Sequence, residues 1–490
     1  MNSKKESVVK IKKYQEKYES ERRKNFGLRK ENKYLRRRKK ELTNSRDSWK
    51  EKSKSKGLEV KELKHEINRK GKIKRHHYPF SIMFLAVSLR VCCSCSYISI
   101  SKILKLFGSY LNFNLEKYPC ANTVQNWVSK VGYFSLEKEN KGLLKGKRLS
   151  LIIDESIRLG QEKLLLILSV PYEKIKAGAL KFKEVNVLYM KAQRSWVGED
   201  IKKILEGLEQ KYEFEIGNIL SDEAGTLKKA SKLFGVVHLP DIMHALATCL
   251  RKTFEKDIDY QSFIKLISLY QRKAVNQALT FLCPPKQRTK ARFMNQFNIV
   301  KWANKMLMFF DQLQSKERAF FEQLPAHQNM IRSLYSCIMI SKNIAAIFRN
   351  LGLCTQTLEI IKQIINSTKG TDKYINAFIG HVHEYLTKKY QVFVENNPSH
   401  AYHVSSEVIE SLFGKYKDKA AYCKLTGLTN LNLELPVLCI EENQLERQIG
   451  RAIEGIFMTD LKKWRKTYST DNQLIKRMNF FKNGTNNSAF

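Results

Sequence analysis

Three acidic residues in this 490-residue chain lie next to apolar segments, where a carboxylate can bind a metal ion or take part in catalysis. Asp154 ends the apolar run LSLIID, Asp222 ends IGNILSD, and Glu410 lies beside an apolar helical face in SSEVIESLFGKY. A charged carboxylate next to apolar side chains is costly unless water or a cation compensates it. Carboxylate oxygens suit Mg²⁺ or Mn²⁺, and two such ions can activate a hydroxyl nucleophile and stabilise a leaving oxygen in phosphodiester chemistry.

An ordinary structural role is the alternative for each acid. Taken singly, Asp154 or Asp222 also fits a helix cap or a turn residue. Both acids, however, end predicted strands of one sheet, and ligands of α/β sheets bind at the carboxyl ends of strands. Glu410 can add a third oxygen ligand from a helix. We therefore predict a catalytic site for two Mg²⁺ or Mn²⁺ ions, formed by these three residues.

The elements that must position these acids begin at residue 147, where the hydrophobic pattern changes from helical to strand-like. Short runs rich in Leu, Ile and Val predict three strands, and a helix, a strand, a helix and a strand follow. This order predicts an α/β sheet over 147–244. The pattern then predicts an all-helical insertion over 245–400 and a core helix over 401–420. Residues 421–490 predict a basic helical region that is expected to be peripheral.

Residues 1–76 are set apart by their charge, with 29 Lys and Arg residues against 11 Asp and Glu. A heptad of apolar residues runs through them, with Asn25 and Asn32 at the companion seam position and a break expected at Gly57. This pattern predicts a basic coiled-coil arm that self-associates, and the alternative is a solvated, partly disordered arm. Either form favours contact with phosphates without sequence reading. The heptad residues are Tyr14, Leu28, Leu35, Leu42 and Trp49.

Residues 77–146 predict a small module of short amphipathic helices. One of them, in ANTVQNWVSKVG, has an apolar face at helical spacing and an opposite face rich in amides. Such a helix pair fits a helix-turn-helix, in which Gln or Asn can pair bidentately with adenine. The alternative is an ordinary helical hairpin in a core. The residues expected to contact DNA here are Thr123, Gln125, Asn126 and Lys130.

The composition favours nucleic acid as the partner. The chain has 88 Lys and Arg residues against 48 Asp and Glu, a formal charge of +40, which exceeds what solubility requires. Its most apolar window, residues 80–89, is about half as long as a membrane-spanning helix. The polar N-terminus shows no signal peptide, and the cysteines, including CCSC at 92–95, lack zinc spacing and indicate reduced core residues. We expect a cytoplasmic protein, nucleoid-associated in a prokaryote, without membrane contact.

The order of the three acids resembles the ribonuclease H-like fold of the DDE transposases, and the details resemble the Mutator-like and hAT-like branch, here of a bacterial insertion sequence. Those families place an all-helical insertion between the second Asp and the Glu, as residues 245–400 would do here. Their final glutamate lies in a motif similar to Thr-Thr-Asn-x-x-Glu-Ser-Leu. SSEVIESL resembles it with Glu410 at the Glu position and Glu407 at the Asn position. The resemblance covers roughly residues 150–415 and implies that Glu410 is the ligand.

One motif departs from that family. Its members carry a Cys-x-x-His after the strand that follows the second Asp, and this chain has PDIMHALA there. Asp241 stands at the Cys position, where its role is open, and His244 stands at the His position, where a contact with DNA is expected. His403 precedes Glu410 and fits either a phosphate contact or a structural role. Asp241, His403 and Glu407 are therefore secondary candidates for the site.

The resemblance implies a metal-dependent transposase that cleaves and transfers DNA strands at the ends of a mobile element. Its partners would be terminal inverted repeats and target DNA, and its working form a homo-oligomer. The expected fold is an α/β ribonuclease H-like catalytic core with a large all-α insertion, preceded by a helical DNA-binding module and a basic coiled coil. Two alternatives stay open: a DNA-binding protein derived from a transposase but without catalysis, and a ribonuclease H-like nuclease without strand transfer.

Overall fold

The computed structural model divides the chain into two compact units, Met1–Ile82 and Met83–Phe490. Finer domain limits within the second unit stay predictions. The described residues are 2–69, 76–110, 117–159, 162–175, 178–276, 279–286, 293, 296–396, 401–420, 430–470 and 473–486.

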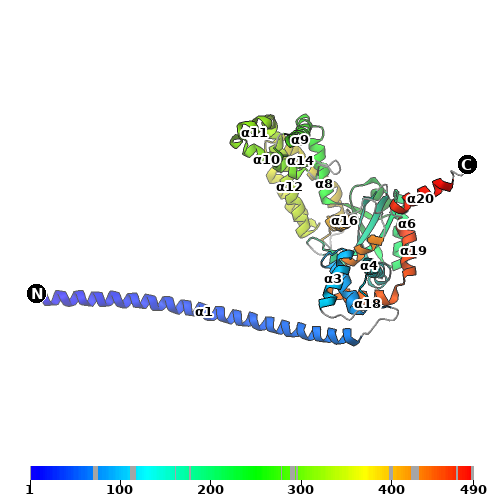
Figure 1. The fold of residues 1–490 in the computed structure, drawn as a ribbon. Coiled ribbons are helices and arrows are strands. Elements are labelled where there is room, and N and C mark those ends of the chain that lie inside the picture. The colour runs from blue at the N-terminus through cyan, green and yellow to red at the C-terminus, as the bar shows by residue number, and fades with distance from the viewer. Residues whose placement is uncertain are drawn as a thin grey trace. The chain divides into compact units, whose positions relative to one another are not determined.

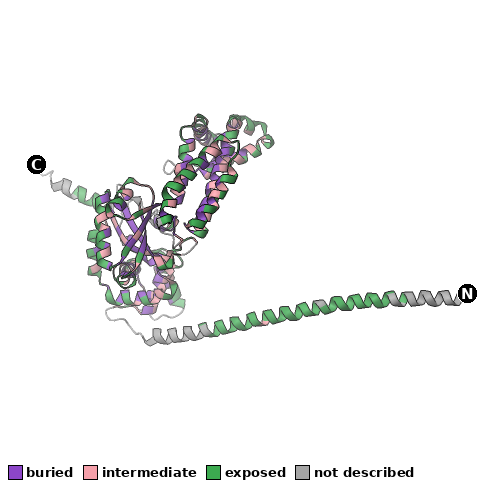
Figure 2. Cartoon of the chain, turned by 180° about the vertical axis from the view of Figure 1, so that it is seen from behind, coloured by how far each residue is buried: buried purple, intermediate pink, exposed green. Residues whose placement is uncertain are grey.

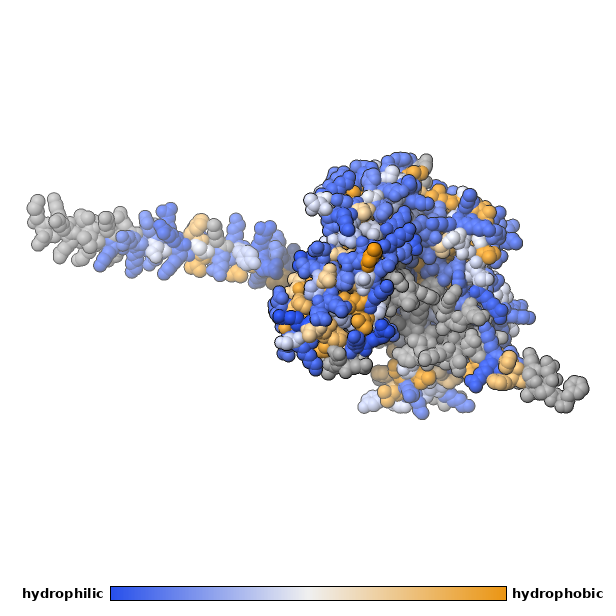
Figure 3. Space-filling model, turned by 90° about the horizontal axis from the view of Figure 1, so that it is seen from above, coloured by the Kyte–Doolittle hydropathy of each residue, from blue (hydrophilic) through white to orange (hydrophobic). Residues whose placement is uncertain are grey.

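The first unit is dominated by one helix, α1 (Asn2–Arg69), whose 68 residues make it about 100 Å long. It continues through Gly57, so the break expected there is wrong. Figure 2 shows the middle part of this helix as exposed, and Figure 3 shows apolar side chains among the hydrophilic ones there. An apolar stripe with a period of seven is what a partner helix would bury, although self-association stays a prediction. Four heptad residues are more than half exposed: Leu28, Leu35, Leu42 and Trp49.

The second unit is built around a mixed sheet with the strand order β3-β2-β1-β4-β5 (Figure 1). Strand β2 pairs antiparallel with β1 and β3, whereas β4 pairs parallel with β1 and β5. The continuous apolar run of β2 suits a strand that is buried on both faces. The observed order of strands and helices is the predicted one. The strands are β1 (Arg148–Leu159), β2 (Glu162–Pro171), β3 (Asn186–Gln193), β4 (Glu215–Ser221) and β5 (Val237–Pro240).

Helices cover both faces of this sheet because alternate residues of each strand point to opposite sides. On one face, Ile153 and Ile167 join a core that includes apolar residues of α6 and α7. On the other face, Ile152 and Leu166 join a core that includes apolar residues of α8 and α16. The helices are α6 (Gly198–Tyr212), α7 (Gly225–Phe234), α8 (Ile242–Phe254) and α16 (Glu407–Ala420).

A block of helices separates β5 from α16, as the sequence predicts, and is drawn in green and yellow in Figure 1. Leu353, just after α12, forms an isolated antiparallel bridge with Tyr402, which leads the chain back towards α16. The longer helices are α9 (Ile258–Asn276), α10 (Phe297–Met308), α12 (Gln328–Leu351), α13 (Thr355–Thr368) and α14 (Lys373–Leu386). The short ones are α11 (Ser315–Phe320) and α15 (Val392–Asn396).

Helix α4 (Ala121–Phe134) lies at the centre of a helical layer. It packs against α3 and against three helices of the C-terminal region, α17, α18 and α19. The expectation that this region is peripheral is therefore wrong for these helices. Gly132 permits this close approach, since a Cβ there would lie 1.7 Å from the carbonyl oxygen of Leu433. The other elements of this layer are α2 (Phe80–Val91), α3 (Tyr97–Tyr110), the π-helical turn η1 (Ser135–Glu139), α5 (Asn140–Leu144), α17 (Glu434–Leu438), α18 (Glu442–Gly455) and α19 (Met458–Tyr468). The last helix, α20 (Gln473–Asn486), contacts the sheet instead, where Lys476 pairs with Glu162 of β2.

Two composition-based expectations can be compared with the structure. None of the described helices is both long enough and apolar enough to cross a membrane. The described cysteines are free, and Cys249, Cys337 and Cys439 are buried as expected. Cys92 and Cys93 are exposed, so the expectation of a core position is wrong for that cluster.

Candidate catalytic site

Asp154 and Asp222 lie on neighbouring strands at the same level of the sheet. Ile152 of β1 pairs with Leu220 of β4 in parallel register, and each acid follows its strand partner by two residues. Strands in a sheet are about 4.8 Å apart, so the two carboxylates share one edge. The sequence pattern predicts that β1 ends at Asp154. The strand instead continues to Leu159, paired with β2. It is the pairing with β4 that stops, which uncovers β1 beside Asp154.

The electrostatic surroundings of Asp154 include the other two acids. Burial raises the pKa of Asp154 to about 7, and the negative charges of Asp222 and Glu410 contribute to the rise. Glu410 lies in the first turn of α16, which packs against β1. Its side chain is 47% exposed. The structure thus brings the three acids predicted from the sequence into one electrostatic neighbourhood, at the edge where β4 ends.

His244, in the first turn of α8, is the cationic member of this group. Its Nε2 lies 3.5 Å from Oε1 of Glu410. Burial alone would lower the pKa of His244, but the hydrogen bond with Glu410 and the charges of Asp241 and Asp222 raise it to about 9. His244 is therefore protonated at neutral pH and faces the acids. Its contact with DNA stays a prediction.

Asp241 has a structural role in holding the site together. Its Oδ1 accepts a hydrogen bond from the backbone N–H of His244 at 2.9 Å and so caps the start of α8. Its Oδ2 accepts hydrogen bonds from the backbone N–H of Ser406 at 2.7 Å and from its hydroxyl at 2.9 Å. The side chain is almost fully buried. Asp241 thereby ties the segment that follows β5 to the start of the helix that carries Glu410.

Glu407 and His403 occupy different surroundings from Glu410. Glu407 Oε1 lies 2.5 Å from a guanidinium nitrogen of Arg349 on α12, so this acid is engaged in an ion pair with the helical block. His403 is buried, 9% exposed, which leaves it little surface for a phosphate. The two glutamates, which sequence alone could separate only through a motif, are thus distinguished by their partners.

Two residues of the site region were not anticipated from the sequence. Ser221, the last residue of β4, donates from its hydroxyl to the carbonyl oxygen of Asp222 at 2.9 Å and lies 2.8 Å from Nε2 of His238. Burial lowers the pKa of His238 to about 4, so this histidine is neutral. The pair fixes the backbone at Asp222. A histidine inside the apolar run GVVHL was the only signal for it.

The residues expected to read DNA are only partly available. Thr123, Gln125 and Asn126 on α4 are partly exposed, and the hydroxyl of Thr123 lies 3.3 Å from the sulfur of Cys120. Lys130 is only 7% exposed, and burial lowers the pKa of its ammonium group. The expectation that Lys130 lies on an open DNA-binding face is therefore wrong. The C-terminal helices that pack on α4 cover that side.

The three acids match a divalent cation in chemistry, although not yet in arrangement. Among the residues that the structure describes, no group of three His, Cys, Asp or Glu side chains is already placed to hold a metal ion. Carboxylate oxygens are nevertheless the ligands that Mg²⁺ and Mn²⁺ prefer. A cation between the acids would relieve the repulsion that raises the pKa of Asp154. Glu410, which is half-exposed, would have to turn from His244 towards such an ion.

Comparison with known proteins gives likenesses among solved structures. No family model and no curated protein matches the chain. Among solved structures, the chain is similar to the Drosophila P element transposase strand transfer complex, with a TM-score of 0.37 and 11% sequence identity. The match covers 81% of this chain and 99% of that chain. Because both values are low, we base the function on the geometry of the carboxylates.

Proposed function

We propose that this chain is a DDE-type DNA transposase with a ribonuclease H-like core, in which Asp154, Asp222 and Glu410 form one metal-dependent site. The observation that carries the proposal is the convergence on Asp154. Its pKa is raised to about 7 by burial and by two acids that come from a different strand and from a helix beyond the helical block. Placing three acids together in this way lowers the stability of the fold. Clusters of this kind, with strongly shifted pKa values, are typical of functional sites.

The roles of the residues follow from their positions. When bound, Mg²⁺ or Mn²⁺ would supply the Lewis acidity that activates a nucleophilic water or 3′-hydroxyl and stabilises the leaving oxygen. Asp154 and Asp222 offer oxygen ligands from neighbouring strands, and Glu410 offers a third from a helix whose start Asp241 fixes. His244, which is cationic at neutral pH, can donate a charge-assisted hydrogen bond to a DNA phosphate at the same edge.

The charge of the chain supports DNA as the substrate. A formal charge of +40 attracts a polyanion, and α1 presents much of it on an exposed helix that can contact phosphates without reading sequence. The apolar stripe of α1 would serve self-association, which places two sites on two element ends. Sequence reading would rest on Gln125 and Asn126, which remain partly exposed. The proposed substrates are the terminal inverted repeats of a bacterial mobile element and its target DNA.

One observation favours a second candidate, a DNA-binding protein derived from a transposase but without catalysis. Glu410 is paired with His244 and is not turned towards Asp154 and Asp222 to complete a metal site. In such a protein this pair would be permanent. The two candidates bind the same DNA and differ only in whether they cut it.

A cleavage assay on the DNA that flanks this gene separates the two candidates. A plasmid that carries both flanking segments is incubated with the full-length chain and Mg²⁺ or Mn²⁺. The proposal predicts breaks at the two element ends that chelation of the ions abolishes. Binding of the flanking DNA without breaks, with either Mg²⁺ or Mn²⁺ present, would support the DNA-binding protein. Absence of both binding and breaks would contradict both candidates.

A further inference from the structure

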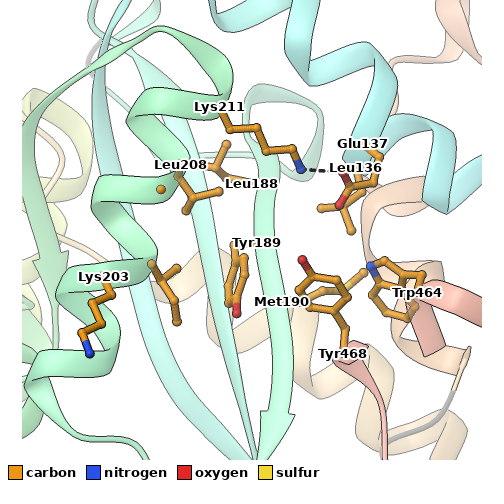
Figure 4. A pocket seen from close by; sticks show the side chains of 12 residues that line it. Leu136, Glu137, Leu188, Tyr189, Met190, Lys203, Leu208, Lys211, Trp464 and Tyr468 are labelled. Atoms are coloured by element: carbon orange, nitrogen blue, oxygen red, sulfur yellow. Dashed lines mark hydrogen bonds and ion pairs between the residues drawn. The ribbon is translucent and has the colours of Figure 1, made fainter. Parts of the chain in front are cut away.

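A pocket of about 240 Å³ lies beside β3, the edge strand of the sheet (Figure 4). Leu188, Tyr189 and Met190 of β3 line it together with residues of α6, α19 and η1. None of these residues belongs to the carboxylate site. Its lining residues come from segments that lie far apart in the sequence, so no local sequence motif predicts the pocket.

One side of the pocket is aromatic. The rings of Trp464 and Tyr468 on α19 are stacked, with centroids 5.5 Å apart and an interplanar angle of 20°. Tyr189 meets Tyr468 edge to face at 5.9 Å and 80°. Figure 4 shows the three rings gathered between β3 and α19. Flat ring faces of this kind stack on another flat ring better than on a branched aliphatic group.

The indole of Trp464 adds a hydrogen-bond donor without a partner. The residue is only 4% exposed, and its Nε1 finds no acceptor among the described residues. A buried N–H that lacks an acceptor costs free energy, so such groups are rarely left unpaired without reason. Figure 4 shows the nitrogen on the side of the indole ring that faces Tyr468. A ligand that carries an acceptor on the edge of its ring would satisfy this donor once a small shift of the neighbouring rings exposes the nitrogen to the pocket.

The other side of the pocket is cationic. Lys203 and Lys211 both extend from α6, and Lys203 is exposed. The ammonium group of Lys211 lies 2.5 Å from a carboxylate oxygen of Glu137, and it also lies 4.6 Å from the centre of the Tyr212 ring. The ligand of such a pocket would combine a planar ring with an anionic group beyond it.

The pocket is level with the carboxylates in the sheet. Met190 of β3 pairs with Leu166 of β2, and Leu166 pairs with Asp154 of β1. The backbone of β3 is thus two strand spacings, or roughly 10 Å, from that of β1. Helix α6, which lines the pocket, and helix α16, which carries Glu410, cover opposite faces of the sheet.

We propose that this pocket binds a nucleobase, with Tyr468 and Tyr189 as stacking partners, Trp464 Nε1 as donor to a ring acceptor, and Lys203 as a phosphate contact. An unpaired nucleotide of a DNA strand and a free mononucleotide share this chemistry. The inference that the base comes from a DNA strand rests on the proposed transposase function, whereas the inference that the pocket binds a base does not. An apolar peptide side chain would offer no acceptor to the indole N–H and no anion to Lys203.

The test uses the full-length chain and a short single-stranded oligonucleotide with 2-aminopurine at one position, whose fluorescence falls when the base stacks. The same oligonucleotide in duplex form and AMP as competitor distinguish the sources. Quenching of the single strand alone, without competition by AMP, assigns the pocket to an unpaired strand. Competition by AMP at similar concentration assigns it to a free nucleotide. Absence of quenching in every form would overturn the proposal.

Five variants, three in the pocket and two controls, locate the signal. Trp464→Phe keeps a ring but removes the donor and should weaken binding roughly 2–10-fold. Tyr468→Leu, at a partly exposed position, should weaken it roughly 5–150-fold. The controls are Trp302→Phe, whose indole donates to the carbonyl oxygen of Leu282, and Lys232→Glu, which matches Lys203→Glu because Lys232 is at an exposed position of α7. Equal binding by Trp464→Phe, Tyr468→Leu and Lys203→Glu would overturn the proposal.

The outcome is separable from that of the proposed function. Asp154→Asn should abolish cleavage and leave the quenching unchanged, because the aspartate does not line the pocket. If the parent chain does not cleave DNA but still quenches the fluorescence, the transposase proposal is refuted and the nucleobase pocket is supported. Cleavage without quenching would do the opposite.

Discussion

Asp241 accepts hydrogen bonds from both the backbone N–H and the hydroxyl of Ser406, at 2.7 and 2.9 Å, although 165 positions separate the two residues. Beside them, the N–H of Ile242 donates to the carbonyl oxygen of Val404 at 2.8 Å. These bonds close the helical block as a loop between β5 and α16. The position of Glu410 beside β1 therefore depends on a carboxylate that is not itself a proposed metal ligand.

Substitution of Asp241 tests this dependence. Asp241→Asn keeps the size of the side chain but replaces one acceptor oxygen by a donor amide, which cannot serve both His244 and Ser406. We expect a loss of about 1–3 kcal/mol in the free energy of unfolding, measured by denaturant titration. Ser406→Ala removes only the hydroxyl bond and should cost less. Equal stability of Asp241→Asn and the parent chain would show that the two segments are held by other contacts.

The raised pKa of Asp154 predicts a pH dependence of stability. Folding raises this pKa from its usual value near 4 to about 7, so the folded chain binds the proton more tightly than the unfolded chain. The benefit is present below about pH 4 and is lost as the pH rises to about 7. Without divalent ions, Asp154→Asn should therefore gain stability relative to the parent above pH 7, by at most about 4 kcal/mol.

The measurement is a series of thermal or denaturant unfolding curves between pH 4 and 8 in the presence of a chelator. The stability difference between Asp154→Asn and the parent should grow with pH and shrink when Mg²⁺ is added. Asp200→Asn, at an exposed position in the first turn of α6, is the control. A difference that does not vary with pH would argue against the clustering of the three acids.

Local patterns were sufficient to predict the order of the strands and the helical block. Asp154 and Asp222 could be identified because each follows an apolar run of its own segment. The Asp241–Ser406 contact could not, because nothing local marks a bond across the whole helical block. The burial of Lys130 was missed for the same reason, since the helices that cover it come from the far end of the chain.

Gly132 offers a test of the buried position of α4. A methyl group there would lie 1.7 Å from the carbonyl oxygen of Leu433, which is backbone and cannot rotate away. Gly132→Ala should therefore cost about 1–3 kcal/mol in the free energy of unfolding, despite the better helix propensity of alanine. Gly142→Ala, where a Cβ would meet nothing within 4 Å, is the matched control. If both variants are equally stable, α4 is not packed by the C-terminal region.

Removal of the N-terminal arm tests its role in DNA binding. Deletion of residues 1–76 removes 29 basic residues, many on the exposed helix α1. The slope of log affinity against log salt concentration should become shallower by about 0.9 for each DNA phosphate that the arm neutralises in the full chain. The measurement is fluorescence anisotropy of a labelled duplex over a salt series. A slope equal to that of the full chain would rule out the arm as a phosphate-binding element.

The central claim is that Asp154, Asp222 and Glu410 act as one site, and the comparison of two glutamates one helical turn apart tests it most directly. Glu410→Gln removes a charge beside Asp154, whereas Glu407→Gln removes one that is paired with Arg349. Rates of Mg²⁺-dependent cleavage of the gene's flanking DNA should fall about 10²–10⁴-fold for Glu410→Gln and for Asp154→Asn and Asp222→Asn, with DNA retention unchanged. Double variants should lose no more than single ones, because the three serve one site. Glu407→Gln should cleave nearly as the parent does; cleavage that survives Glu410→Gln but not Glu407→Gln would contradict the account.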